Sequence, residues 1–184
     1  MNNHFDKQKI TFRPLVAGDL KLLFKWLRSS HVHEFYDKDK EITLDNVSRR
    51  YLPKIKGEKP TDCFYVLYDN KPVGYIQKYF IKDWEDWSNI LDYDDSVESI
   101  DLFLGDKSYI GKGFGSLMLS EFLNQVVFVD PKIKLCVIGP EPSNTRAIHV
   151  YEKVGFKYIK TVRLDGDTED TYLMELNKVN SDKK

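Results

Sequence analysis

The chain has 184 residues, with 28 Lys and Arg against 29 Asp and Glu, a net charge of −1 and 41% hydrophobic residues. This length suits one domain whose core needs no disulfide or metal to hold it together. The balanced charge argues against a general nucleic-acid binder or a basic membrane-surface protein, which would carry an excess of Lys and Arg.

The first half of the chain alternates short strands and helices. The helical period of apolar residues predicts a helix over 19–27, and Thr43 is the expected N-cap of a second helix that Pro53 stops. The remaining elements are strands at 9–13, 63–68 and 73–80, with a turn at 69–72 that makes the last two a hairpin.

The second half begins with an acidic loop, and strands and helices follow it. Over 99–104, Ile100, Leu102 and Leu104 share one strand face, and Asp101 and Phe103 share the other. The other expected elements are helices at 116–128 and after Ser143 or Asn144, ending at Gly155, and strands at 134–138, 156–163 and 171–176, the last two joined at Asp165-Gly166. This order indicates an α+β or α/β fold with a central mixed sheet.

The N-terminal stretch is polar, and no run of 18 apolar residues is present, so we expect neither a secretory signal nor a membrane span. Cys63 and Cys136 are expected to be buried free thiols, and the four histidines have no metal-ligand spacing. We therefore expect a cytoplasmic, metal-free domain over 1–184, monomeric or weakly homodimeric, with flexible ends at 1–8 and 178–184.

Charge is distributed unevenly along the chain. Residues 61–106 hold 11 acidic and 3 basic side chains, and the seven acids between Asp83 and Glu98 have no base among them. Such a run is commonly a solvated loop. Trp84 and Trp87 lie inside it, however, and carboxylates beside aromatic rings suit a pocket for an organic cation.

A glycine-rich turn precedes the helix at 116–128. Residues 111–115 read GKGFG. Successive backbone N–H groups at a helix N-terminus form a site for a pyrophosphate. The turn matches neither the P-loop nor the Rossmann fingerprint. Taken alone, it is equally consistent with a purely structural turn.

Two motifs together resemble the Gcn5-related N-acetyltransferase (GNAT) superfamily. They are residues 110–115, IGKGFG, and residues 143–156, SNTRAIHVYEKVGF, about thirty residues apart. Ile110 stands where that superfamily usually has Gln or Arg, but the backbone donors do not depend on this side chain. The resemblance implies a central mixed, mostly antiparallel twisted sheet with helices on both faces.

Further segments are similar to aminoglycoside 6′-N-acetyltransferases across residues 9–177. These segments are HVHEFY at 31–36, RYLP at 50–53, VGYIQ at 73–77, SIDLFL at 99–104 and EDTYLME at 169–175. The similarity implies transfer of the acetyl group of acetyl-CoA to the 6′-amine of a polycationic antibiotic, without a metal and without a nucleic-acid or membrane partner.

The resemblance also implies site residues. The cofactor-binding residues would be Phe103, Leu104, Ile110, Gly111, Lys112, Gly113, Phe114, Gly115, Ser116, Asn144 and Ala147, with a backbone N–H of Phe103 or Leu104 facing the oxyanion. Tyr151 would be the general acid for the departing thiolate. Asp101 would first bind and orient the amine and second act as base or relay.

The substrate-binding residues would be Phe35, Tyr36, Tyr51, Trp84, Asp86, Asp101, Glu141, Asp167 and Asp170. One departure concerns the drug. Related enzymes tend to have Asp-Pro before the Ser-Asn helix, whereas this chain has Gly139-Pro140, and Glu141 is the candidate to compensate.

Two other functions remain open at this point. The first is an acyltransferase for a siderophore precursor or a protein amine, although residues 61–106 offer few bases for an anionic substrate. The second is a non-catalytic module that binds acetyl-CoA, which the presence of both Asp101 and Tyr151 disfavours.

Overall fold

The computed structural model describes residues 5–38, 40–88, 90–163 and 168–178, apart from the side chain of Asp86. The chain forms two compact units. Unit 1 comprises Met1–Lys78 and Asp101–Glu121, and unit 2 comprises Tyr79–Ile100 and Phe122–Lys184. In the described ranges, no helix has the length and apolar character needed to cross a bilayer.

The strands form a mixed, mostly antiparallel sheet, which confirms the expected fold class. Their hydrogen-bonded order is β1-β2-β3-β4-β5-β7-β6, and the pairing of β4 with β5 is parallel. The strands are β1 (Ile10–Pro14), β2 (Asp62–Tyr68), β3 (Lys71–Phe80), β4 (Val97–Leu104), β5 (Leu135–Ile138), β6 (Lys157–Val162) and β7 (Thr171–Asn177).

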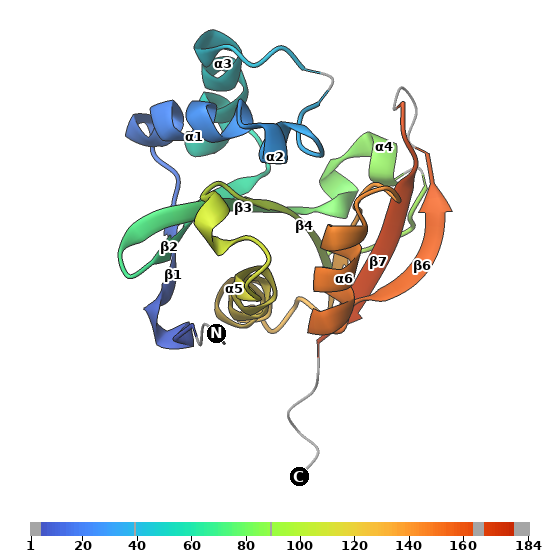
Figure 1. Ribbon diagram of the computed structural model, residues 1–184. Helices are drawn as coiled ribbons and strands as arrows, with labels where there is room; N and C mark the ends of the chain where they lie inside the picture. The colour runs from blue at the N-terminus through green and yellow to red at the C-terminus, as the bar shows by residue number, and fades with distance from the viewer. Residues whose placement is uncertain (1–4, 39, 89, 164–167, 179–184) are drawn as a thin grey trace. The chain divides into compact units, whose positions relative to one another are not determined.

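In unit 1, helices cover both faces of the strands. Helices α1 (Leu20–Leu27), α2 (Ser30–His33) and α3 (Leu44–Ile55) lie on one side of β2 and β3, and α5 (Phe114–Phe122) lies on the other (Figure 1). Short 3₁₀ turns at Lys7–Lys9, Ala17–Asp19 and Lys107–Tyr109 join these elements. The β2–β3 hairpin turns at Asp69 and Asn70, whose positive φ angles of 53° and 63° suit short polar side chains.

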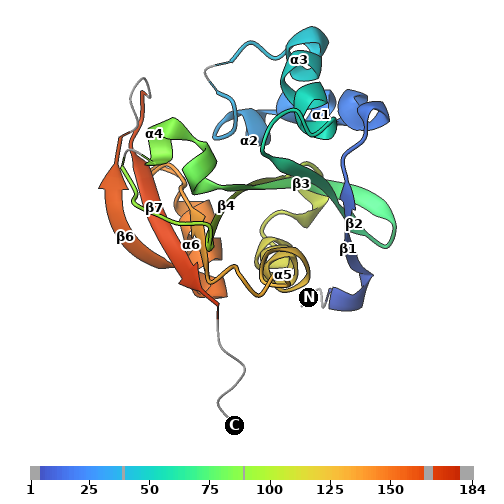
Figure 2. The ribbon, with the colours of Figure 1, turned by 180° about the vertical axis from the view of Figure 1, so that it is seen from behind.

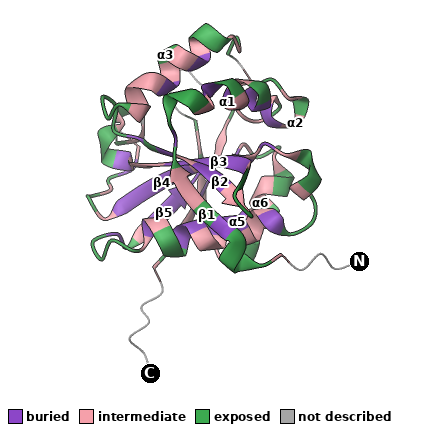
Figure 3. Ribbon diagram, turned by 90° about the vertical axis from the view of Figure 1, so that its left-hand side faces the viewer, coloured by how far each residue is buried: buried purple, intermediate pink, exposed green. Residues whose placement is uncertain are grey.

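Apolar side chains from α1, α3 and the inner strands form the core of unit 1. Strands β2 and β3 are largely buried, whereas the helices keep an exposed face (Figure 3). The buried members are Leu15, Leu20, Leu23, Trp26, Leu27, Val32, Val47, Tyr51, Cys63, Tyr65, Tyr75 and Phe103. This core supports β3 and the second half of β4, which carry Gln77 and Asp101.

Helix α3 differs from its prediction at one end. Thr43 is the N-cap, as expected, and accepts a hydrogen bond of 3.1 Å from the Asn46 N–H. Pro53, however, lies inside the helix, which continues to Ile55. The fixed φ of proline is compatible with a helix, and the actual stop is Gly57, whose φ is +73°. The extra turn brings Lys54 onto the helix.

The N-terminal end that is predicted to be flexible, 1–8, contains one packed side chain. The ring of Phe5 packs against Tyr68, Tyr109 and Phe114 at centroid distances of 5.7, 5.9 and 5.0 Å. At the other end, the Lys178 N–H donates to the Lys134 carbonyl at 2.7 Å. Residues 1–4 and 179–184 lie outside the described residues.

In unit 2, helix α6 (Thr145–Val154) packs along one face of β7 and β6 (Figure 2). It ends at Gly155, with φ of +111°, as expected. The helix predicted over 116–128 begins earlier, at Phe114, and its last part, Leu123–Val127, is a π-helical turn. The predicted turn at Asp165-Gly166 lies outside the described residues.

The acidic segment is not the plain loop expected from its sequence. It contains a 3₁₀ turn at Ile81–Asp83 and a one-turn helix, α4 (Glu85–Ser88). Trp87 explains this order, because its ring packs on a buried apolar cluster that includes Ile81, Leu91 and Leu173. Burial of these apolar groups fixes the backbone between the charged positions.

Candidate functional site

The glycine turn in unit 1 has the geometry of an anion-binding helix start. Gly111 and Gly113 have φ angles of +73° and +81°, and a Cβ on either would meet no atom within 4 Å. Glycine is therefore required here by the backbone conformation and not by crowding. The turn is exposed and leads into α5, whose first N–H groups have no intrahelical acceptors.

Buried aromatic packing holds the start of α5 in place. Phe114 has no exposed surface and packs against Tyr109 at 4.8 Å and Tyr68 at 5.4 Å. Ser116 donates its hydroxyl to the Gly113 carbonyl at 3.0 Å. Ile110 is partly exposed and extended, and Lys112 is exposed. The turn thus presents backbone donors from an anchored helix, as an anion site requires.

Asp101, in β4, accepts a short hydrogen bond from a buried neighbour in β3. The Gln77 Nε2 amide donates to Asp101 Oδ2 at 2.6 Å, and Gln77 is 5% exposed. Asp101 as a residue keeps intermediate exposure. The amide bond fixes the orientation of the carboxyl group.

Two more side chains complete this network in unit 1. The Gln77 Oε1 atom accepts from Lys54 Nζ at 3.0 Å and from the Tyr75 hydroxyl at 2.8 Å. Our site prediction missed Gln77 and Lys54. A polar Gln inside an otherwise apolar strand was the available signal for Gln77, whereas nothing in the sequence indicates the contact from α3.

Burial and charge act in opposite directions on the pKa of Asp101. Removal from water is the largest effect and raises this pKa above its ordinary value of 3.8, whereas the Gln77 hydrogen bond and the Lys54 and Arg50 charges lower it. The net direction is upward. Desolvation likewise lowers the pKa of the Lys54 ammonium from its ordinary value of 10.5.

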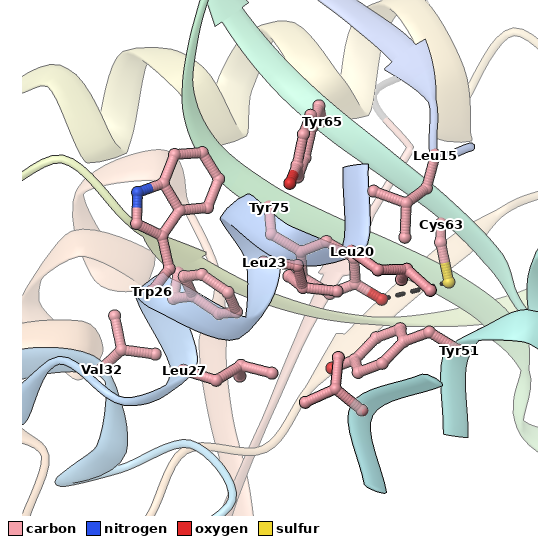
Figure 4. Close-up of a cluster of buried hydrophobic side chains, with 12 residues drawn as sticks. Leu15, Leu20, Leu23, Trp26, Leu27, Val32, Tyr51, Cys63, Tyr65 and Tyr75 are labelled. Carbon is pink, nitrogen blue, oxygen red and sulfur yellow. Dashed lines mark hydrogen bonds between the residues drawn. The ribbon is translucent and has the colours of Figure 1, made fainter. Parts of the chain in front are cut away.

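Aromatic rings line the surroundings of Asp101. Phe103 stacks on Tyr75 at 5.3 Å, and Tyr36 meets Phe103 edge-on at 4.9 Å. Tyr51 packs edge-on against Tyr75 at 5.7 Å, and the Tyr75 hydroxyl hydrogen-bonds Cys63 Sγ at 3.1 Å (Figure 4). Phe103 is 8% exposed, so the face of β4 that carries it is covered at this point.

The residues of unit 1 that are predicted to contact the substrate differ in how exposed they are. Phe35 and Tyr36 are partly exposed after α2. Tyr51 has no exposed surface and packs against Tyr75, so a direct substrate contact from Tyr51 stays a prediction. Tyr51 does border a cavity of about 290 Å³ with Arg50 and Asp37, which form an ion pair.

A histidine holds the end of β4, where an oxyanion donor is predicted. His31 Nε2 hydrogen-bonds the Leu104 carbonyl at 3.0 Å. Since a carbonyl only accepts, Nε2 carries the proton. The parallel pairing of β4 with β5 covers Val97–Ser99, so β4 extends to Leu104, beyond the residues that pair with β5.

In unit 2, the predicted residues of α6 are structurally well defined. Asn144 is the N-cap, and its side chain accepts from the Ala147 N–H at 3.1 Å. Tyr151 is 7% exposed, with its ring 6.1 Å from that of Phe156. Ala147 keeps intermediate exposure. The cap explains why Asn is needed at the start of this helix.

Several carboxylates of the acidic segment have local partners. Asp95 pairs with Lys82, and Asp94 accepts from the Ser96 N–H and hydroxyl, which lowers the Asp94 pKa. Glu98 is buried in β4. Trp84 is partly buried and meets Tyr79 edge-on, and Asp86 lies in α4 with its side chain outside the described residues.

The remaining predicted carboxylates differ in availability. Asp170 accepts from Arg163 Nε at 2.8 Å, so its charge is already paired, and its role in the substrate site stays a prediction. Asp167 lies outside the described residues. Glu141 is partly exposed beside Ser143, 3.4 Å from its hydroxyl.

Gly139 occupies a crowded position in unit 2. A Cβ built there would lie 2.5 Å from Thr171 Cγ2 and 3.6 Å from the Trp87 ring. Glycine in place of Asp at this position therefore fits the local packing, because Thr171 already fills the space that a side chain would need.

Comparisons with known proteins agree with this geometry. A family model described as an acetyltransferase (GNAT) domain matches residues 16–164. An aminoglycoside N(6′)-acetyltransferase type 1 of Klebsiella pneumoniae is 32% identical over 156 residues, which cover 83% of this chain and 76% of that protein. A crystal structure of AAC(6′)-Ib with coenzyme A and kanamycin superposes with a TM-score of 0.82 at 30% identity, covering 92% of this chain and 95% of that one.

The crowding at Gly139 predicts a stability effect. We expect Gly139→Ala to lower the free energy of unfolding by about 1 kcal/mol, since the added methyl group overpacks against Thr171. Thr171→Ser removes the opposing methyl group and should recover most of the loss in the double variant. Urea unfolding of both single variants and the double variant measures this coupling, and strictly additive losses would contradict it.

Proposed function

Because the chain belongs to the GNAT acetyltransferase family, we propose that it transfers the acetyl group of acetyl-CoA to the 6′-amine of aminoglycoside antibiotics and so inactivates them. The observation that carries this proposal is the pairing of an anchored glycine turn with a carboxylate, Asp101, that a buried amide orients, on a chain similar to named aminoglycoside enzymes. The resemblance seen in the sequence is confirmed at the level of the family.

The glycine turn would hold the pyrophosphate of acetyl-CoA. Its exposed backbone at Gly111, Lys112 and Gly113 precedes nine residues of helix, so N–H donors and the positive helix end face the same side. Further contacts from α5 would come from Phe114, Gly115 and Ser116, and from α6 through Asn144 and Ala147. Acetyl-CoA is a cosubstrate here, and the reaction needs no metal.

Asp101 would bind and orient the amine. Ordinary Asp and alkylammonium pKa values differ by about 6 units, so direct proton transfer would cost about 9 kcal/mol. The raised pKa of Asp101 narrows this gap between the two pKa values. Asp101 therefore acts first through a charge-assisted hydrogen bond, and second as the base or relay once the amine attacks.

In the chemical step, the neutral amine nitrogen attacks the thioester carbonyl carbon. A backbone N–H of Phe103 or Leu104 would stabilise the oxyanion, and His31 holds the Leu104 peptide in place. The C–S bond then breaks, and the leaving thiolate takes the hydroxyl proton of Tyr151. The nitrogen loses its extra proton towards Asp101 or water, which leaves an amide and free coenzyme A.

Aromatic and acidic side chains would receive the drug. Phe35 and Tyr36 are partly exposed aromatic residues, and aromatic rings suit the apolar faces of sugars. Trp84, Asp86 and Glu141 supply carboxylates and a ring for the ammonium groups. Asp167 would contribute a further carboxylate. Asp170 would first have to break its ion pair with Arg163.

Cellular context follows from the same features. The two free cysteines are buried and unbridged, which suits a reducing compartment. We place the enzyme in the cytoplasm, as a monomer or weak homodimer that acts on small molecules and not on nucleic acid or membranes. A siderophore precursor or protein amine is the alternative substrate, and the named relatives favour the aminoglycoside.

Substrate class is tested by the release of the coenzyme A thiol. We expect turnover with kanamycin and tobramycin, and none with a kanamycin analogue whose 6′-amine is replaced by hydroxyl. A polyamine and a lysine peptide are the comparison substrates. Turnover of the peptide alone would contradict the proposal, and acetylation of the analogue would contradict the 6′ position.

Asp101→Asn tests the role of the carboxylate. We expect kcat/KM to fall about 100-fold or more, with folding retained. In the wild type, log kcat/KM should rise through two ionisations, one of the substrate amine and one of Asp101 above pH 3.8, because only ionised Asp101 accepts the amine. The variant should lose the second ionisation. Asp92→Asn, at an exposed position, is the control, and near wild-type kcat/KM in Asp101→Asn removes the residue from the mechanism.

Tyr151→Phe tests the general acid. We expect kcat to fall about tenfold to 100-fold, with unchanged affinity for coenzyme A, since the hydroxyl acts only on the leaving sulfur. Steady-state kinetics and calorimetry measure the two quantities. Tyr158→Phe, at a half-exposed tyrosine, is the matched control. A Tyr151→Phe enzyme with the wild-type kcat would rule out this role.

A further inference from the structure

Lys54 presents an amine within the network that leads to Asp101, and the proposed mechanism does not use it. Its Nζ atom donates to Gln77 Oε1 at 3.0 Å, and the same amide donates from Nε2 to Asp101 Oδ2 at 2.6 Å. The amide thus connects the lysine to the carboxylate through two hydrogen bonds.

The chemistry of Lys54 determines how the amide points. An ammonium group has three donors and no acceptor, so only the oxygen of Gln77 can face it. Tyr75 adds a second donor to that oxygen, at 2.8 Å. With Oε1 occupied in this way, the NH₂ end of the amide is directed at Asp101, where a flipped amide would set two oxygens against each other.

Among the charges near Asp101, Lys54 is the cation without a carboxylate partner. Arg50, one turn earlier on α3, forms an ion pair with Asp37. Over the described ranges, no ion pair includes Lys54, whose Nζ also lies 5.3 Å from the centroid of the Tyr51 ring. The uncharged titratable neighbours are Cys63 from β2, Tyr75 from β3, Tyr36 after α2 and Tyr51 from α3.

We propose that Lys54 is a positioning residue for Asp101, acting through Gln77 to orient the carboxylate and keep it ionised for the substrate amine. Gln77 occupies Oδ2, which leaves Oδ1 for the incoming ammonium group. This inference rests on the proposed function for its role in catalysis, but the network itself belongs to the unliganded protein and is measurable there.

The supporting electrostatics have a consistent sign. The Lys54 charge and the Gln77 hydrogen bond both lower the Asp101 pKa against the upward effect of burial. Removing Lys54 deletes one of these two effects and loosens the other. The Asp101 pKa should therefore rise, and less of the carboxylate is ionised at a given pH.

The test compares Lys54→Met with Lys54→Arg, which keeps a charge and donors, and with Lys59→Met at an exposed control position. We expect Lys54→Met to lower kcat/KM about tenfold, the scale of one lost charge-assisted hydrogen bond. The Asp101 ionisation in the pH profile should move to higher pH, with the substrate ionisation unmoved. Lys54→Arg should restore part of the activity, and Lys59→Met should match the wild type.

A readout without substrate separates this inference from the proposed function. Carboxyl ¹³C chemical shifts of Asp101 against pH, in the unliganded wild type and Lys54→Met, should show the higher midpoint in the variant. If the wild type did not acetylate aminoglycosides, the proposed function would be overturned, and the chemical-shift comparison would still test the inference about Lys54. An unchanged Asp101 midpoint in Lys54→Met overturns the inference.

A double-mutant cycle tests the route through the amide. If Lys54 acts through Gln77, then Lys54→Met in a Gln77→Leu background should change kcat/KM by less than twofold, because the link is already absent. A full tenfold loss in that background would show that Lys54 acts independently. Should Lys54→Met not fold, Lys54→Gln provides the same comparison with a neutral side chain that can still donate.

Discussion

The hydrogen bond from Gln77 to Asp101 is the interaction on which the chemistry of unit 1 depends. A carboxylate that is partly removed from water needs a fixed donor, because an unpaired charge there costs several kcal/mol. The donor comes from a buried side chain whose other end is held by Tyr75 and Lys54. A hairpin strand and a helix are therefore both required before Asp101 has a defined orientation.

The aromatic packing around this bond serves a second purpose. Tyr36, Tyr75 and Phe103 pack on one another close to Asp101, and a low local dielectric of this kind strengthens electrostatic interactions. The contact between Tyr75 and Phe103 also joins β3 to the second half of β4. Core packing and site geometry thus depend on the same side chains, and a change in one affects the other.

Prediction from the sequence succeeded where local pattern and chemistry agree. The N-caps Thr43 and Asn144, the glycine turn and Gly155 each act through neighbours within a few residues, so their roles could be read directly. The prediction that Pro53 stops α3 is wrong, because the helix continues through Pro53 to Ile55 and Gly57 ends it. The Lys54–Gln77 contact joins residues 23 positions apart and could not be deduced from periodicity.

The acidic segment shows a different limit. Its charge sum predicted a cation pocket, and this stays a prediction. Asp94 accepts a hydrogen bond from Ser96, Asp95 pairs with Lys82, and Glu98 is buried. A count of charges along the sequence does not show which carboxylates already have a partner. The order of this segment comes instead from Trp87 and the apolar cluster beneath it, a packing effect that composition alone understates.

The two buried cysteines have a consequence for how the chain can be observed. Cys63 lies in unit 1 and Cys136 in unit 2, and neither forms a disulfide. A thiol becomes reactive only when its surroundings open and the thiolate forms, and burial raises the pKa of Cys63 further. Each unit therefore carries its own chemical label site, and the rates at which the two sites are modified by a thiol reagent report local opening of each unit separately.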